Sequence, residues 1–185
     1  VMYPAGFASQ ISVKGVSDEL DGAARPGHFD GVATVVCKLF NQVQPDIALF
    51  GEKDWQQVAV IRRMALDLNL TRPSADAILG IATVREMDGL AMSSRNAYLT
   101  PEQREIASVL PAAMRVAIAA IEAGTDANEA LAHLARALLE AGFLSVDYAE
   151  LRDAINLTLL QARSDKPMRL LVAARIGKAR LIDNM

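Results

Sequence analysis

The chain has 185 residues, 52% of them hydrophobic and 22% charged, which is the balance of a globular protein with enough apolar material for a core. A net charge of −3 gives no electrostatic basis for general nucleic-acid binding, although a site for a small anion needs only a few cations. The sequence has no apolar run of about 18 residues, so we expect no membrane partner and a cytoplasmic location. The single cysteine, Cys37, lies among apolar residues and is expected to be a small buried core residue.

The first part of the chain alternates helix and strand. Residues 30–44 carry apolar side chains at helical spacing, and Pro45 ends that helix. The apolar run 46–50 predicts a strand buried on both faces, residues 55–70 predict an amphipathic helix, and residues 77–84 predict a second buried strand. This order is typical of a parallel sheet with helices outside it and predicts an α/β fold.

The pattern changes beyond the second strand. A new helix is predicted to begin with Thr100 as N-cap, Pro101 in the first turn and Gln103 as the partner in a capping box. The elements expected after this start are a break near Pro111, a stop at Gly124, a helix over 125–142 and strands over 145–151, 169–176 and 179–184. We therefore predict two domains, residues 1–82 and residues 83–185, of which the second is a small α+β domain.

The segment "GEKD" follows the first strand directly, at the edge of the sheet where open α/β proteins bind ligands. Gly51 allows close approach of a ligand to the backbone, Lys53 can pair with phosphate, and Asp54 can accept bonds from two ribose hydroxyls. Gln57, one turn further on, is expected to face the same crevice. The alternative is a polar loop in which Asp54 caps the next helix and Lys53 is solvated.

The segment "VREMDGLAMSSRNAYLT", residues 84–100, is the second candidate. "REMDG" predicts a hairpin with Asp88 and Gly89 as the central pair of its turn. "MSSR", residues 92–95, offers two hydroxyls, backbone amides and a guanidinium, which suit triphosphate oxygens and the charge of a departing pyrophosphate. The alternative is a serine-rich loop with a structural arginine.

A third candidate is the turn that places Arg25 and His28 on either side of a Pro-Gly pair. His28 can equally be an exposed loop histidine, and His133, on a predicted helix, is expected to be structural. No Cys/His spacing indicates a metal site, and neither a Walker A motif nor GxGxxG occurs in the sequence. Any nucleotide site is therefore expected to be of another type.

The blocks "RPGHFDGVATVVCKLFNQVQPDIALFGEKDWQQ", "REMDGLAMSSRNAYLT" and "ARLIDNM", in this order and spacing, strongly resemble the C-terminal portion of the pantothenate synthetase (pantoate–β-alanine ligase) family. This family belongs to the nucleotidyltransferases related to class I aminoacyl-tRNA synthetases. The resemblance implies that residues 1–82 are the C-terminal part of a Rossmann-like nucleotide-binding domain. It also implies that residues 83–185 are a lid domain, whose "MSSR" is similar to the KMSKS loop.

The resemblance implies an AMP-forming acid–amine ligase of the coenzyme A pathway. Its partners would be the small molecules pantoate, β-alanine and ATP with Mg²⁺, joined through a pantoyl-adenylate with loss of pyrophosphate. The residues implied to bind ATP are Gly51, Glu52, Lys53, Asp54, Val84, Met92, Ser93, Ser94 and Arg95. Those implied to act in catalysis are Lys53, Ser93, Ser94 and Arg95, with Gln57 on pantoate and Arg25 and His28 near the site. Intact family members are commonly homodimers.

The chain also departs from the family pattern. The family's HxGH signature is expected upstream of "VMYP", and without it this chain is expected to be catalytically incomplete. Asp30 stands where many relatives carry Arg, and Trp55 where Tyr or Phe is usual. The alternatives are a non-catalytic nucleotide-binding or assembly fragment and an adenylyltransferase that acts on a different acid.

Overall fold

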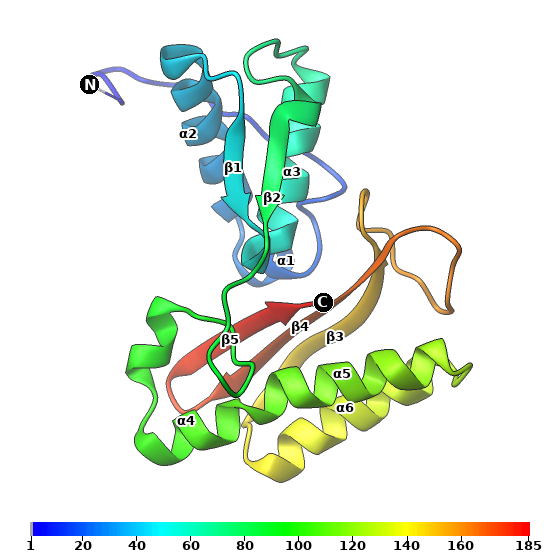
Figure 1. Ribbon diagram of the computed structural model, residues 1–185. Helices are drawn as coiled ribbons and strands as arrows, with labels where there is room; N and C mark the ends of the chain where they lie inside the picture. The colour runs from blue at the N-terminus through cyan, green and yellow to red at the C-terminus, as the bar shows by residue number, and fades with distance from the viewer. Residues whose placement is uncertain (1) are drawn as a thin grey trace. The chain divides into compact units, whose positions relative to one another are not determined.

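The computed structural model describes residues 2–185, which form two compact units divided between Ala82 and Thr83 (Figure 1). The first unit contains a parallel sheet and the second an antiparallel sheet. The predicted α/β class is therefore confirmed, and the two units are described separately below.

The first unit is built on two parallel strands joined by a helical crossover. Its elements are α1 (Asp21–Ala24), α2 (His28–Val43), β1 (Ala48–Gly51), the 3₁₀ turn η1 (Glu52–Asp54), α3 (Trp55–Asp67), the 3₁₀ turn η2 (Ala75–Ala77) and β2 (Ile78–Ile81). Ala48 pairs with Ile78 and Gly51 with Ile81 along the two strands. Because both strands run in the same direction, the residues that follow them leave the sheet at the same edge.

Only one face of this sheet is buried, which corrects the expectation of burial on both faces. Ala48 and Ile78 are buried opposite each other, and the Phe50 ring lies 6.3 Å from the Phe40 ring of α2. Leu49 points to the other face and is 61% exposed. Further large apolar side chains exposed in and beside these strands are Ile47, Leu79 and Ile81. None of the described residues covers this second face well.

The second unit packs helices on one face of a three-stranded antiparallel sheet. Its elements are the 3₁₀ turn η3 (Ser94–Tyr98), α4 (Pro101–Ala107), α5 (Val109–Glu122), α6 (Ala127–Ala141), β3 (Ser145–Asp153), β4 (Met168–Ile176) and β5 (Ala179–Asn184). The strand order is β3-β4-β5, and α5 and α6 lie side by side (Figure 1). The core between helices and sheet includes the fully buried side chains Leu110, Met114, Leu138, Leu170 and Ile176.

Several local signals in the second unit act as the sequence predicts. Thr100 and Gln103 form the reciprocal hydrogen bonds of a capping box at the start of α4. The helix breaks at Ser108, so that Pro111 falls in the first turn of α5, where its missing N–H costs no helical bond. Gly142 ends α6 in the left-handed conformation.

Two simpler expectations concern single features of the chain. Cys37 lies in α2 as a free, buried thiol, which confirms that it is a core residue. Among residues 2–185, no helix combines the length and the apolar composition that a membrane span requires.

Candidate functional site

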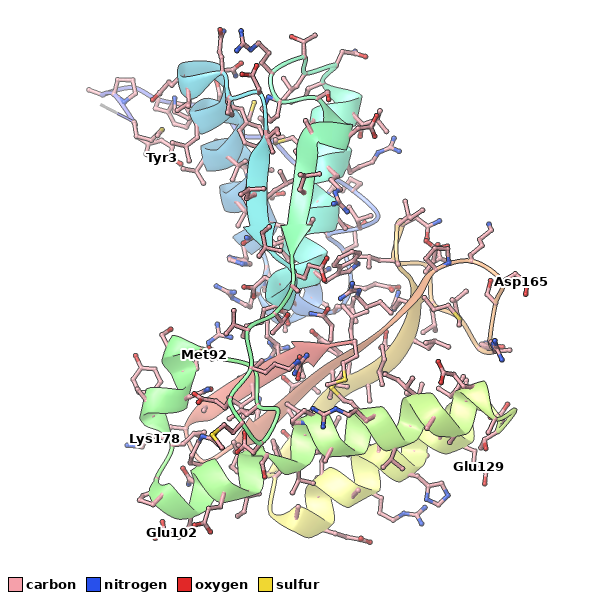
Figure 2. All side chains as sticks on the ribbon, viewed as in Figure 1. Tyr3, Met92, Glu102, Glu129, Asp165 and Lys178 are labelled. Atoms are coloured by element: carbon pink, nitrogen blue, oxygen red, sulfur yellow. The ribbon has the colours of Figure 1, made fainter. Side chains whose placement is uncertain are left out.

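The predicted site residues fall into two sets, one in each unit. Residues 51–57 lie at the end of β1 and the start of α3, and residues 84–95 lie between β2 and α4. Figure 2 labels Met92 on the second of these segments.

The loop after β1 is held in a defined conformation. Gly51 has an extended backbone, and a Cβ built on it would meet no atom within 4 Å, so packing within the described chain does not require glycine here. Lys53 is only 18% exposed in its side chain, and its Nζ lies 3.9 Å from Asp54 Oδ1. Asp54 occupies the N-cap position of α3, but its side chain makes no capping hydrogen bond. The alternative is thus met in the position of Asp54 at the N-cap, but not in a capping hydrogen bond or in a fully solvated lysine.

The Glu52 side chain lies over Gly80 of β2. A Cβ built at Gly80 would be 2.7 Å from Glu52 Oε1 and 2.8 Å from its Cγ, closer than nonbonded carbon atoms approach. Gly80 thus leaves the room that the carboxylate occupies. The sequence signal for this role is a glycine inside an apolar strand, "ILGI", which indicates close approach of another group.

The two adjacent glutamines at the start of α3 have different surroundings. Gln56 is 5% exposed; its Nε2 donates to Val16 O at 2.9 Å and to Glu19 O at 2.8 Å, and its Oε1 accepts from Asp21 N at 3.0 Å. Gln56 therefore anchors the segment that leads into α1, a role that the sequence did not reveal. Gln57, the residue predicted to bind substrate, is only partly buried.

The turn at Pro26 and Gly27 brings Arg25 and His28 into contact with each other. Arg25 Nη1 lies 3.0 Å from His28 Nε2, and Gly27 between them is left-handed with φ 77° at the N-cap of α2. A guanidinium can only donate, so the histidine nitrogen that faces it is the acceptor. His28 also packs its ring on that of Phe29.

Residues 84–92 form the predicted hairpin, with a turn displaced by one residue. Gly89 N donates to Glu86 O at 2.9 Å, which makes Met87 and Asp88 the central pair and Gly89, at φ 90°, the left-handed residue after them. Asp88 Oδ1 accepts from Leu90 N and so closes the turn. The prediction of Asp88 and Gly89 as the central pair is therefore wrong by one position.

The stem of this hairpin is only partly paired. Arg85 and Ala91 form an isolated antiparallel bridge, flanked by bonds from Glu86 N to Leu90 O at 2.8 Å and from Met92 N to Val84 O at 2.9 Å. The reciprocal bond from the Val84 N–H to the Met92 carbonyl is not formed among the described residues. The Val84 N–H and the Met92 carbonyl therefore remain unused at the open end of the stem, where the side chains of Val84 and Met92 are exposed.

The serine and arginine residues that follow are folded into η3. Ser93 Oγ accepts from Arg95 N at 3.2 Å, and Ser93 O accepts from Asn96 N at 3.0 Å. Asn96 Nδ2 donates to Ala91 O at 3.1 Å, which ties η3 to the hairpin. Ser94 is exposed and Arg95 is partly buried.

Three arginines hold the hairpin within the second unit. Arg85 donates to both oxygens of Asp183 on β5, at 2.7 Å and 2.9 Å, and also to Gly89 O at 3.0 Å. Arg104 of α4 donates to Asp88 at 2.6 Å. That hydrogen bond holds the pKa of Asp88 below its usual value and raises the pKa of Arg104. A Cβ at Gly89 would lie 2.3 Å from Arg115 Nη2, so Arg115 covers the turn.

None of these arginines was singled out from the sequence. Arg85 lies in a quoted motif and Asp183 in "ARLIDNM", but nothing in either stretch indicates that the two residues pair. Among residues 2–185, no group of three or more His, Cys, Asp or Glu side chains is arranged to hold a metal ion.

Comparisons with known proteins give a consistent result. The model of the family described as "Pantoate-beta-alanine ligase" matches residues 1–185. A pantothenate synthetase of Novosphingobium aromaticivorans is 66% identical over 184 residues, and one of Rhizorhabdus wittichii is 58% identical over 184 residues; each match covers 100% of this chain and 64% of the relative. The chain thus spans about two thirds of the length of these curated relatives, a share of 64%.

Solved structures show the same likeness. The crystal structure of pantothenate synthetase from Thermus thermophilus matches with a TM-score of 0.90 and 45% identity, over 100% of this chain and 65% of that one. The pantoate–β-alanine ligase of Francisella tularensis, crystallised with β-γ ATP and β-alanine, matches with a TM-score of 0.74 and 32% identity. That match covers 100% of this chain and 60% of the other.

Proposed function

The chain belongs to the pantoate–β-alanine ligase family, as its motifs predict, and we propose that it serves the ATP-dependent condensation of pantoate with β-alanine. The observation that carries this proposal is the family match over the whole chain. The reaction proposed is that of an acid–amine ligase that releases AMP and pyrophosphate.

The chemistry has two steps. A carboxylate oxygen of pantoate attacks the α-phosphorus of ATP, the bond to pyrophosphate breaks, and pantoyl-adenylate forms. The amine of β-alanine then attacks the acyl carbon, the bond to AMP breaks, and the amine loses a proton as the amide of pantothenate forms. Neither step needs a covalent bond to the protein, so catalysis consists of positioning and of stabilising charge on the phosphates.

We assign the residues of the first unit to ribose, phosphate and pantoate. Lys53 would direct its ammonium toward the phosphates, and Asp54 would accept from the ribose hydroxyls. Gly51 and Glu52 complete the ATP-binding loop, and Gln57 would bind pantoate. The low exposure of the Lys53 side chain supports this assignment, because a surface lysine without a binding partner is normally exposed to solvent. Arg25 and His28 are assigned no direct contact with substrate.

We assign the residues of the second unit to adenine and phosphates. The unused Val84 N–H and Met92 carbonyl offer one donor and one acceptor side by side, which matches the N1 acceptor and the N6 donor of adenine. Guanine presents the reverse pattern on this edge. Ser93, Ser94 and Arg95 would hold the phosphates, with the Arg95 guanidinium stabilising the leaving pyrophosphate.

Three further parts of the proposal rest on family membership alone. Mg²⁺ would arrive with the phosphates of ATP, and we derive no step through it. The intact protein is proposed to be cytoplasmic. It is also proposed to be a homodimer, and light scattering on the purified protein tests this oligomeric state.

The test of the function is product formation. The chain is incubated with ATP, Mg²⁺, pantoate and β-alanine, and pantothenate and AMP are measured by mass spectrometry, with circular dichroism to confirm that the sample is folded. Product that requires all three substrates supports the ligase. A folded chain that gives no product does not catalyse the reaction by itself, and nucleotide binding then decides whether it is a binding fragment.

A pair of lysine variants tests the assignment of the ATP site. Lys53→Ala is expected to weaken ATP binding by about tenfold or more, because it removes a partly buried cation next to the phosphates. The matched control is Lys178→Ala, which removes an exposed lysine (Figure 2) in the turn between β4 and β5. Equal affinities of Lys53→Ala and wild type contradict the assignment of residues 51–54.

A further inference from the structure

We infer that Arg85 and Asp183 are a positioning pair that sets the selectivity of the second unit for adenine. The inference rests on the proposed function and deepens it, because it names two residues that would act on ATP through the Val84 and Met92 backbone. Neither side chain is assigned a contact with substrate.

The Arg85 guanidinium joins three parts of the second unit. It donates to Asp183 Oδ2 at 2.7 Å and to Oδ1 at 2.9 Å, to the Gly89 carbonyl at 3.0 Å and to the Asn184 carbonyl at 3.3 Å. These bonds fasten the stem of the 84–92 hairpin to its own turn and to β5. Two parallel bonds to one carboxylate fix the orientation of the arginine as well as its distance.

The pair is well placed to be rigid. The Asp183 side chain is 1% exposed and the Arg85 side chain 22% exposed, and Asp183 Oδ1 also accepts from Asn184 N at 2.8 Å. The carboxylate is therefore fixed by its own strand, which belongs to the core sheet of the unit. A buried carboxylate with two bonds to one guanidinium has little freedom to change partner.

The position of Arg85 in the hairpin gives this rigidity a function. Arg85 follows Val84 directly, and its bridge partner Ala91 precedes Met92. The last described bond of the stem, from Met92 N to Val84 O, lies beyond this bridge, and the reciprocal bond is absent. The spacing of the unused donor and acceptor therefore depends on the Arg85–Ala91 bridge. Recognition of a base edge by one donor and one acceptor requires that spacing to be held to about 0.5 Å.

Two conservative variants separate geometry from charge. Asp183→Asn keeps the shape of the side chain but leaves only one acceptor oxygen for the Arg85 guanidinium. Arg85→Lys keeps the positive charge but loses the pair of parallel donors. The matched control is Asp147→Asn, which breaks another arginine–aspartate contact of the same sheet, with Arg180 Nε 2.7 Å from Asp147 Oδ2. Asp147 makes no described contact with the hairpin.

The experiment has one readout that needs no ligand and one that does. Amide hydrogen exchange of Glu86 and Met92 reports the order of the stem, and calorimetric titration with ATP and with GTP reports base selectivity. Asp183→Asn and Arg85→Lys are both expected to speed exchange at these two amides and to lower the ATP-to-GTP affinity ratio by about tenfold or more. Asp147→Asn is expected to change neither, after correction for its global stability.

The outcomes are distinct. Unchanged exchange in Asp183→Asn overturns the positioning role, whatever happens to nucleotide binding. Faster exchange with an unchanged affinity ratio overturns the link to adenine. Wild-type selectivity in Arg85→Lys shows that charge alone is sufficient and also overturns the inference. A wild-type chain that binds neither nucleotide overturns the proposed function and, with it, the adenine role, while the exchange data still decide whether the pair orders the hairpin.

Discussion

The two units fasten their loops with different chemistry. In the first unit, the neutral amide of Gln56 makes three hydrogen bonds to the backbone of residues 16–21. In the second unit, Arg85 and Arg104 fasten the 84–92 hairpin by ion pairs with Asp183 and Asp88.

Depth accounts for this difference only in part, because Asp183 is as buried as Gln56 and is compensated there by the Arg85 guanidinium. Gln56 is almost completely buried, where an amide with all its bonds made costs far less than a charge. The Asp88–Arg104 pair lies near the surface, where charges remain solvated and their attraction is weak. A neutral anchor does not respond to pH, whereas the Asp88 carboxylate, whose pKa is lowered by its hydrogen bond from Arg104, contributes only while it is ionised. The first unit is therefore expected to depend on single buried contacts and the second on pH and salt.

The largest expected effect is at Gln56. Gln56→Ala removes three hydrogen bonds to the backbone, those with Val16 and Asp21 in buried surroundings, which is expected to destabilise the first unit by about 3 kcal/mol. Urea unfolding followed by the fluorescence of Trp55, the only tryptophan in the chain, measures this directly.

The neighbouring glutamine is the matched control for that variant. Gln57→Ala removes the same side chain one position along α3, where it is only partly buried. Its unfolding free energy is expected to lie within about 0.5 kcal/mol of wild type, because such a surface change affects stability little. Equal losses in the two variants contradict the view that Gln56 is the anchor.

The second prediction concerns acid and the second unit. Burial by itself raises the pKa of Asp147, but hydrogen bonds from Arg180 and Arg175 outweigh it and hold the pKa below its usual value. A depressed pKa stabilises the folded state above the unfolded value of about 4, and this contribution is lost as the pH falls through the folded value. Asp147→Asn is therefore expected to cost about 1–2 kcal/mol at pH 7.

The pH dependence of that cost is the decisive measurement. Calorimetric unfolding of wild type and Asp147→Asn is compared between pH 7 and the lowest pH at which both fold. The difference should shrink as the pH falls below about 4, because wild type then loses the ionised carboxylate as well. A difference that stays constant or grows toward acid contradicts the ion-pair anchoring.

The third prediction tests the close approach of the Glu52 side chain to Gly80. Gly80→Ala places a Cβ against Glu52, and because that side chain is flexible its carboxylate should move while stability changes by less than about 1 kcal/mol. Thermal unfolding and ATP titration measure the two effects, and the proposed ATP contact of Glu52 predicts weaker binding.

Gly31→Ala is the control for this glycine. Gly31 lies in α2 and a Cβ there would meet no atom within 4 Å, so alanine should stabilise the helix by about 0.5–1 kcal/mol. In the double variant Glu52→Ala/Gly80→Ala, any loss of stability caused by the Gly80→Ala change should disappear. A loss of stability that persists without the Glu52 side chain has another cause.

The smallest expected effect is at the tip of the hairpin. Asp88→Asn weakens an exposed pair with Arg104 and is expected to cost at most about 0.5–1 kcal/mol. Thermal unfolding at low and high salt measures it, and the cost should fall as salt screens the pair. A larger cost that salt does not reduce means that the tip, too, has a buried anchor.

Much of the fold follows from local signals along the chain. The capping box at Thr100, the break before Pro111 and the end of α6 at Gly142 depend on residues close in sequence, and all three are where the sequence predicts them. The hairpin at residues 84–92 was also predicted, although its turn is shifted by one residue because Gly89 takes the left-handed position after the central pair. Family membership also followed from the motifs, since their order and spacing are a property of the sequence alone.

Burial and long-range pairing were decided only by the tertiary structure. The exposure of Leu49 depends on which helices cover the sheet, and a short apolar strand has the same sequence pattern whether one face or both faces are covered. Gln56 and Gln57 are indistinguishable as letters, yet one is an anchor and the other is accessible, because α3 turns about 100° between them. Arg85 and Asp183 are almost a hundred positions apart, and only the folding of β5 beside the hairpin brings their charges together. The sequence thus determined the elements, their local ends and the family. The contacts between distant elements, which hold the candidate site in shape, required the folded chain.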